Sequence, residues 1–394
     1  MFSFFQNALG ALIGVFFALL LASSVGDNFS EKAPASPEKT GASIEEILPP
    51  ETIAYLKEGM EETALKEIPT EAEPPAKEES VPEENTLPVE TPPPAPPSPP
   101  EKPPAEEPPA LSALELNAGG REATVNIFCT LNGGIDALSG SGVIIDERGI
   151  VLTNAHIAQY FLLDTRRGEE FVLCTIRAGS PAKPAWKGEL LYLPSLWFDT
   201  HADEINEENR VDTGEHDFAL VRITDAIGNA SSSFPALRPA YDGAGIVRGE
   251  SVLVASYPAG FLDAEAIYKN LWQISSITVI KEIYNFASST RSVIDVFSVP
   301  GVIGAQEGSS GGAVIRGRDG RLLGLATTRS RGDTTGERDL FALSLPYINA
   351  DVETDLEKSL EEFLSSDLLA YQKWFNQTVL PRMKERLLRA VEEN

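Results

Sequence analysis

Short apolar runs alternate with glycine-containing turns from residue 123 to residue 345. The runs are rich in Val and Ile, and few stretches between them are long and amphipathic, which is typical of β-strands. The first six expected strands are residues 125–131, 142–146, 150–153, 171–177, 187–193 and 218–223. The next six are residues 251–257, 272–282, 293–299, 313–316, 321–328 and 340–345. We therefore expect a mainly β domain over residues 113–350.

The pattern becomes helical after residue 345. Apolar side chains recur at helical spacing in three successive runs, of which the first opens with a Thr-x-x-Glu capping box at residues 354–357 and the last with Pro381. Residues 351–394 are therefore expected to form a C-terminal helical extension. Part of it should pack on the β domain, and the remainder is a candidate for joining copies of the chain into a homo-oligomer.

An uncharged apolar run lies within residues 1–26. A run of about 18 to 20 such residues is long enough to cross the hydrocarbon core of a bilayer as a helix. The first basic residue, Lys32, follows the run among acidic residues, which favours export of the part C-terminal to it. We expect a transmembrane anchor, with a signal peptide cleaved near residues 22–24 as the alternative.

Residues 27–112 have a different composition. They hold 20 acidic residues against 6 Lys, and 20 of the chain's 29 prolines. Such a segment buries too little apolar surface to offset its ordering entropy, so we expect a disordered, extended linker between the membrane and the β domain. The net charge of the whole chain is −27, and this repels phosphates, so a nucleic-acid partner is not expected.

A candidate catalytic nucleophile lies in residues 308–312, Gly-Ser-Ser-Gly-Gly. The glycines permit a sharply bent backbone that leaves the Ser310 hydroxyl pointing outward. A serine hydroxyl is a poor nucleophile unless a base lies beside it and donors stabilise the oxyanion that it creates. The amides of Gly308 and Ser310 are free to act as these donors. A glycine-rich loop with serine is also typical of an ordinary turn, so the prediction depends on the partners of Ser310.

The chain has three histidines from which a base can come. His156 ends an apolar run with Thr-Asn-Ala-His, and His216 stands directly before Asp217 at the start of an alternating strand. His201 lies in an acidic insertion and is interpreted as incidental. The order His156, Asp217, Ser310 supplies a base, an orienting carboxylate and a nucleophile. Asp212 and Asp225 are alternative carboxylates that lack the motif context of Asp217.

These motifs resemble those of trypsin-like serine proteases with the chymotrypsin fold, and most of all those of bacterial HtrA-type proteases. Residues 153–156 resemble the family's Thr-Asn-x-His, residues 217–221 its Asp-x-Ala-Leu-Leu, and residues 308–313 its Gly-Asn-Ser-Gly-Gly-Ala. Residues 139–145 resemble the glycine-flanked strand that precedes the family's histidine. The resemblance covers roughly residues 118–350 and implies two six-stranded antiparallel β-barrels with the three motifs between them.

The resemblance also implies a mechanism. His156 would take the proton of Ser310 as it attacks a peptide carbonyl, Asp217 would hold the imidazole, and the amides of Gly308 and Ser310 would bind the oxyanion. The expected protein is a membrane-anchored serine endopeptidase, acting on proteins or peptides outside the cytoplasm, in the periplasm or at the cell surface. No metal or cofactor is expected. The alternative is a catalytically silent, protease-like binding protein on an anchored stalk.

By the same resemblance, the substrate would lie along Gly304 and along Leu325, Ala326 and Thr327, adding to the latter as a strand. No Asp in these stretches could bind a basic side chain, so a small or medium apolar residue is the expected preference. Two features depart from the families. The C-terminal extension is too short for the PDZ domain of HtrA-type proteases, and Ser309 replaces the Asp that pairs with a new N-terminus in animal zymogens.

Cys129 and Cys174 each stand within an apolar strand. Two buried free thiols are the favoured interpretation. A disulfide is the alternative, because an exported domain meets oxidising conditions. The acidic insertion at residues 199–215 holds seven carboxylates, but their spacing does not fit a recognised calcium loop, so it is interpreted as a solvated surface loop.

Overall fold

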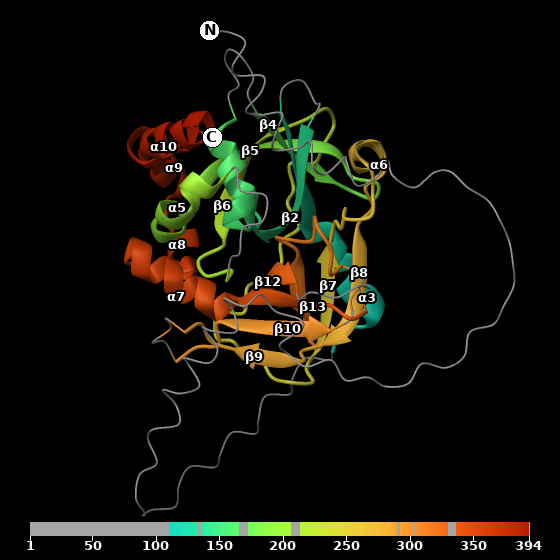
Figure 1. The fold of residues 1–394 in the computed structure, drawn as a ribbon. Helices are drawn as coiled ribbons and strands as arrows, with labels where there is room; N and C mark the ends of the chain where they lie inside the picture. Colours follow the sequence, from blue (N-terminus) through green and yellow to red (C-terminus); the bar gives the residue numbers. More distant parts are fainter. Residues whose placement is uncertain are drawn as a thin grey trace, which may run out of the picture. The chain divides into compact units, whose positions relative to one another are not determined.

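The computed structural model describes residues 110–131, 136–164, 172–205, 213–287, 289, 292–300, 302, 304–329 and 336–393. The expected anchor at residues 1–26 lies outside this part of the chain, and so does the expected linker except for its last three residues. Among the described residues, no helix combines the length and the apolar character needed to cross a bilayer. The described residues form two β-sheets with helices at their surface (Figure 1).

The first six strands form a closed antiparallel barrel in the order β1-β2-β3-β6-β5-β4. The strands are β1 (Thr124–Leu131), β2 (Asp136–Asp146), β3 (Ile150–Thr153), β4 (Val172–Ala178), β5 (Lys183–Tyr192) and β6 (Ala219–Ala226). Each contributes fully or almost fully buried apolar side chains to one core, among them Val125, Ile144, Val151, Ile176, Leu190 and Val221. The prediction of a first six-stranded barrel is confirmed.

The second half is an open sheet of seven strands in the order β8-β7-β11-β12-β13-β10-β9. Its strands are β7 (Ser251–Ser256), β8 (Ile274–Val279), β9 (Glu282–Tyr284), β10 (Val296–Pro300), β11 (Ala313–Arg316), β12 (Leu322–Arg329) and β13 (Asp339–Ser344). The prediction of a second closed, six-stranded barrel is wrong. The single strand expected at residues 272–282 is broken, because Ile280 donates its amide to Glu250 beside β7 while Lys281 donates its amide to Ser298 in β10.

A helix that the strand pattern did not predict opens the domain. Helix α3 (Ala113–Ala123) begins with a capping box, in which Ser112 accepts from the amide of Glu115 and the Glu115 side chain accepts from the amide of Ser112. Gly120 lets α3 approach the second sheet, since a Cβ there would lie 2.8 Å from Ile315 and 2.9 Å from Leu253. The shorter elements are α4 (Ala155–Ala158), η3 (Gln159–Leu162), α5 (Ser195–His201), η4 (Ala202–Glu204) and α6 (Ala264–Asn270).

Four helices follow β13, namely α7 (Leu345–Leu356), α8 (Leu360–Leu364), α9 (Leu368–Thr378) and α10 (Leu380–Glu393). The predicted start at a Thr354 capping box is wrong: the hydroxyl of Ser344 accepts from the amide of Tyr347 and caps α7, whereas Thr354 lies inside the helix and donates to the Ala350 carbonyl. The expected boundary between residues 350 and 351 consequently falls within α7.

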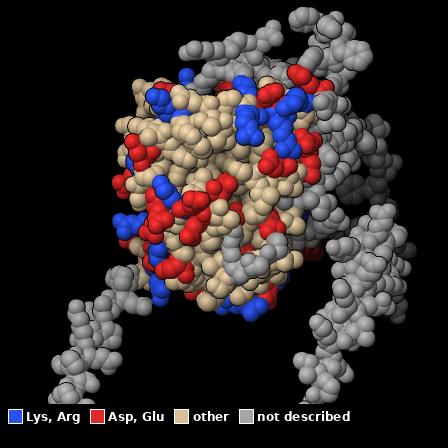
Figure 2. Space-filling model, turned by 90° about the vertical axis from the view of Figure 1, so that its left-hand side faces the viewer, with Lys and Arg blue, Asp and Glu red and all other residues tan. Residues whose placement is uncertain are grey.

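The C-terminal helices pack on the β domain, as expected. Phe375, Met383 and Leu387 join the core of the first barrel. Residues of α7 and α8 join a second cluster, which also contains side chains of β3, β6, β7 and β12 and so connects the two halves of the domain. Arg386 of α10 pairs with Asp199 and Asp203 at 2.9 Å each, on the side that carries these helices, where acidic side chains gather (Figure 2).

Cys129 and Cys174 lie directly opposite each other in the ladder between β1 and β4, with their Cα atoms 4.0 Å apart. The structure joins them as a disulfide within the barrel core, so the favoured interpretation as free thiols is wrong and the alternative holds.

Candidate active site

His156 and Asp217 form a paired base and carboxylate at the mouth of the first barrel. His156 lies in α4, directly after β3, and Asp217 lies just before β6, which pairs with β3. Nδ1 of His156 is 2.8 Å from Oδ2 of Asp217, and the amide of His156 donates to Oδ1 at 3.0 Å. Since an ionised carboxylate only accepts, Nδ1 carries the proton and Nε2 is left as the basic nitrogen.

Asp217 is held in place by contacts of its backbone as well as by contacts of its side chain. The amide of Asp217 donates to the Gly214 carbonyl at 3.2 Å, and the carbonyl of Asp217 accepts from Nδ2 of Asn154 at 2.7 Å. Gly214 has a φ of +80° and His216 a φ of +60°, so the turn depends on left-handed backbone on both sides of Glu215. Asp217 is only 1% exposed, which leaves little room for its carboxylate to move.

Thr327 of β12 is the third group on this carboxylate, donating its hydroxyl to Oδ2 of Asp217 at 2.9 Å. Burial by itself would raise the pKa of Asp217. The charge of His156, the hydrogen bonds from His156 and the hydrogen bond from Thr327 outweigh the burial and hold that pKa below its ordinary value. Asp217 therefore stays ionised at neutral pH, as a residue that orients an imidazole must.

Ser310 lies in the second half of the domain, in the loop before β11. Its Oγ donates to the carbonyl oxygen of Thr327 at 3.1 Å. Among the described residues, no hydrogen bond joins this hydroxyl to His156. The base and the carboxylate are thus assembled, whereas the hydroxyl of Ser310 is turned towards the backbone of β12.

Two glycines shape this loop and cannot carry side chains. Gly308 has a φ of +84°, and a Cβ on it would lie 2.7 Å from the carbonyl oxygen of Tyr257. Gly311 has a φ of +85°, and a Cβ on it would lie 2.0 Å from the carbonyl oxygen of Ser141. Positive φ and close backbone contact both require glycine at these positions, as the sequence indicated.

The peptide bond between Glu307 and Gly308 is oriented by a contact with Ala259, in the loop after β7. The Glu307 carbonyl accepts from the Ala259 amide at 2.7 Å, and since a trans peptide points its C=O and N–H in opposite directions, the Gly308 amide faces away from Ala259. Neither the Gly308 nor the Ser310 amide donates to any described residue. Both amides are therefore available to an oxyanion.

Ser141 of β2 is a residue of this site whose role the sequence did not reveal. Its side chain is completely buried; the hydroxyl donates to the Gly308 carbonyl at 2.7 Å and accepts from the Tyr257 amide at 2.9 Å. Its amide donates to the Ser310 carbonyl at 2.7 Å. The Gly-Ser-Gly pattern was recognised, but the partners of this hydroxyl lie more than a hundred residues away in sequence. No local signal could identify them.

The residues predicted to bind substrate have different surroundings. Gly304 lies beside two buried hydroxyls, since a Cβ on it would be 3.1 Å from Oγ of Ser256 and 3.8 Å from Oγ of Ser309. Leu325 and Ala326 are fully buried, and the amide and carbonyl of Ala326 are bonded to the backbone of residues 311–312. Their side chains belong to the core, so only backbone beyond Ala326 remains for a substrate strand. Binding of substrate along these residues stays a prediction.

A cavity of about 270 Å³ lies next to Thr327 and is bordered mostly by apolar and aromatic residues. Its lining residues are Thr213, Tyr284, Asn285, Phe286, Val296, Thr327 and Phe341. The contact with Thr327 places it beside the residue that touches both Asp217 and Ser310. Its apolar walls suit the expected small or medium apolar side chain.

The other candidates lie apart from this centre. Nδ1 of His201 is 2.6 Å from Oε2 of Glu204, three residues further along the chain. Asp225 stands in β6 opposite Lys187 of β5 and is exposed, and Asp212 lies outside the described residues. Among the described residues, no group of three His, Cys, Asp or Glu side chains is arranged to hold a metal ion.

Comparison with known proteins gives one family. Residues 140–325, which include His156, Asp217 and Ser310, match the family model of the trypsin-like peptidase domain. No curated protein matches the chain. Among solved structures, the chain is similar to the Rv3671c protease of M. tuberculosis in its active form, with 19% identity over 66% of this chain and 94% of the other and a TM-score of 0.36.

Two further solved structures are similar to the chain. The HtrA-type protease AlgW with a tripeptide shares 19% identity over 63% of this chain and 65% of the other, with a TM-score of 0.38. A serine endoprotease from Yersinia pestis shares 18% identity over 63% of this chain and 67% of the other, with a TM-score of 0.39.

Proposed function

We propose that the chain cleaves peptide bonds through His156, Asp217 and Ser310. The basis is its trypsin-like peptidase domain, which makes it a serine endopeptidase. One observation carries the proposal. Thr327 donates its hydroxyl to Asp217 and accepts the hydroxyl of Ser310 on its carbonyl, so the carboxylate and the nucleophile meet at a single residue. His156 is bonded to that same carboxylate oxygen.

The reaction begins with a rotation of one side chain. Ser310 turns about its Cα–Cβ bond from the Thr327 carbonyl towards Nε2 of His156, which then takes the hydroxyl proton as Oγ attacks the peptide carbonyl. The imidazolium gives this proton to the leaving amine, which leaves an acyl-enzyme on Ser310. A water molecule, deprotonated in turn by His156, releases the acid and restores the hydroxyl.

Asp217 and two amides provide the electrostatic part of catalysis. The buried carboxylate stabilises the imidazolium and keeps its Nδ1 proton in place. The amides of Gly308 and Ser310 bind the oxyanion, and the loss of one such donor typically costs about 2.7 to 4 kcal/mol of barrier. Ser141 and Ala259 hold the loop that presents these amides.

The test is labelling of the whole chain with a fluorophosphonate probe, which reacts only with an activated serine. Wild type should label, while Ser310→Ala and His156→Ala should not, and Asp217→Asn should label at a rate lowered by about four orders of magnitude. Absence of labelling in folded wild-type protein would refute the proposal. It would favour the alternative, the catalytically silent binding protein.

We further propose that the protein is anchored in a membrane by residues 1–26 and that the protease domain acts outside the cytoplasm. The apolar run, the acidic linker and the disulfide within the barrel support this location. In cell fractions, the full chain should resist extraction with alkaline carbonate and be released by detergent. Recovery of the full chain in the soluble fraction would contradict the anchor.

The C-terminal helices are also proposed as the site of self-association. Leu369 and Trp374 of α9 are 67% and 48% exposed, so this helix leaves large apolar side chains in solvent. Light scattering of the chain should give a mass above that of the 42.5 kDa monomer, and Leu369→Glu should return it to the monomer. A monomeric wild type would refute this assembly.

A further inference from the structure

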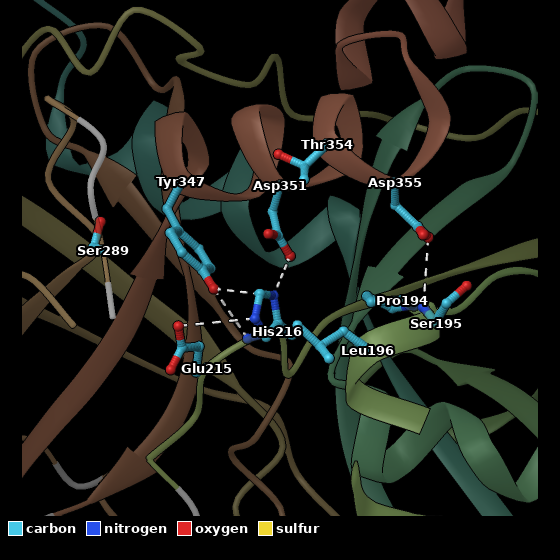
Figure 3. A pocket seen from close by; sticks show the side chains of 10 residues that line it. All are labelled: Pro194, Ser195, Leu196, Glu215, His216, Ser289, Tyr347, Asp351, Thr354 and Asp355. Carbon is cyan, nitrogen blue, oxygen red and sulfur yellow. Dashed lines mark hydrogen bonds and ion pairs between the residues drawn. The ribbon is translucent and has the colours of Figure 1, made fainter. Parts of the chain in front are cut away.

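A second histidine–aspartate pair lies next to the first, because its histidine, His216, directly precedes Asp217 in the chain. Nδ1 of His216, the residue before Asp217, is 2.6 Å from Oδ2 of Asp351 on α7. The hydroxyl of Tyr347, one turn earlier on α7, accepts the amide of His216 at 3.1 Å and lies 3.3 Å from Nδ1. Figure 3 shows both side chains of the helix pointing at the imidazole. One face of α7 therefore holds both the backbone and the ring of His216.

This contact lies at a strained position of the chain. His216 has a φ of +60°, a left-handed conformation that residues with a Cβ adopt rarely. The amide of Phe218 donates to the carbonyl of His216 at 2.8 Å, so the strained residue forms part of the turn that presents Asp217. Because 216 and 217 are adjacent, any change in the backbone of His216 moves the attachment point of the Asp217 side chain.

The carboxylates around this imidazole have separate roles. Asp351 is 4% exposed and carries the short contact to Nδ1, while Glu215 lies 3.8 Å from Nε2. Asp355, the next residue on the same side of α7, is directed elsewhere: it accepts from the hydroxyl of Tyr192 at 3.0 Å and from the amide of Ser195 at 3.4 Å. Both Asp351 and Asp355 border the same cavity of about 340 Å³ (Figure 3).

We propose that Tyr347 and Asp351 clamp His216 and that this clamp positions Asp217 against His156. The proposal rests on the proposed function, because it concerns the carboxylate of the same centre. His216 is a positioning residue: it touches neither substrate nor the reacting atoms, and acts only through the backbone of its neighbour. The first helix of the C-terminal extension thereby becomes part of what makes the serine reactive.

The experiment measures the rate of fluorophosphonate labelling of the full chain against probe concentration, which separates the maximal rate constant from the half-saturating concentration. The variants are Asp351→Asn, His216→Ala, their combination, and His216→Asn, whose amide can still donate to Asp351 and whose backbone tolerates positive φ. Asp355→Asn is the matched control, since it removes a charge from the same cavity and the same helix without touching His216. Circular dichroism and thermal unfolding identify any variant that does not fold.

We expect Asp351→Asn and His216→Ala to lower the maximal labelling rate about tenfold or more with an unchanged half-saturating concentration, since a displacement near 1 Å can cost about a hundredfold. The combination should be no slower than His216→Ala alone, and His216→Asn should recover most of the wild-type rate. Asp355→Asn should label at the wild-type rate.

The clamp is refuted if folded Asp351→Asn and His216→Ala keep the wild-type maximal rate, or if their losses simply multiply in the combination. Equal losses in Asp351→Asn and Asp355→Asn would also overturn it, because they would trace to the charge of the cavity and not to His216. An inactive wild type would instead overturn the proposed function, so the two failures are distinguishable.

Discussion

Removal of one buried hydroxyl, in Ser141→Ala, should weaken both the fold and the chemistry. The hydroxyl connects β2 to the Gly308 carbonyl at 2.7 Å and to the Tyr257 amide at 2.9 Å, with no access to solvent. Alanine fits the site sterically but leaves one buried acceptor and one buried donor without this partner. The variant thus tests how far the loop around Ser310 depends on the first barrel.

The magnitude follows from these two groups. An unsatisfied buried polar group costs about 1 to 3 kcal/mol, which gives about 2 to 6 kcal/mol for two. Partial relaxation of the loop favours the lower half of that range, about 2 to 4 kcal/mol of unfolding free energy. Because the Gly308 carbonyl loses its anchor, the adjacent oxyanion amides lose part of their alignment. We expect the maximal labelling rate to fall about 10-fold to 100-fold, below the full loss of about 10²- to 10³-fold for a missing donor.

The assay combines urea unfolding with the saturation kinetics of fluorophosphonate labelling. Ser139→Ala is the matched control: Ser139 stands two residues earlier in β2, and its hydroxyl accepts from Nδ2 of Asn126, which keeps its bond to the Gly140 carbonyl. The control should stay within about 1 kcal/mol of wild type and label normally. A Ser141→Ala protein with the stability and the labelling rate of the control would refute the role of this hydroxyl.

Four further outcomes are expected. Thr327→Val should lower the maximal labelling rate about tenfold, because the carboxylate of Asp217 loses one of its donors, and a wild-type rate would contradict this. The pKa of Asp217 in the folded protein lies below its ordinary value of 3.8. The ionised carboxylate therefore stabilises the fold fully above pH 3.8, and this stabilisation is lost as the pH falls below 3.8. Between pH 6 and pH 2, the urea midpoint should consequently drop less in Asp217→Asn than in wild type. Gly311→Ala should cost more than about 3 kcal/mol in urea unfolding, since its Cβ meets a carbonyl of β2 at positive φ, and a stable variant would show that the loop adapts. Replacing Cys129 and Cys174 together by Ala should cost about 4 kcal/mol, as expected for a bridge spanning 45 residues, and an unchanged urea midpoint would mean that the bridge does not form.

The first barrel and the bent loop around Ser310 could be predicted because their signals are local. Alternating Val and Ile residues indicate strands, and the glycines at 308 and 311 indicate a backbone that residues with a Cβ rarely adopt. The order of His156, Asp217 and Ser310 along the chain was enough to group them, because a family resemblance supplied the distances that the residues alone do not contain.

The features that could not be predicted depend on contacts between distant residues. The break at Ile280 and Lys281 arises because their amides find acceptors in different strands, which no local pattern encodes. The sequence also could not tell that the side chains of Leu325 and Ala326 lie in the core, because the alternation that marks a strand does not tell which of its faces is covered. The disulfide likewise depends on the register between β1 and β4.

Thr327 lies 110 residues after Asp217 and 17 after Ser310, and it is the residue at which these two groups meet. This order determines when the two contacts of Thr327 can form during biosynthesis. The ribosome has synthesised His156, Asp217 and Ser310 before it adds β12, the strand whose Thr327 contacts both Asp217 and Ser310. Nascent chains and truncated products that end before β12 consequently hold all three proposed catalytic groups without the residue that connects Asp217 to Ser310.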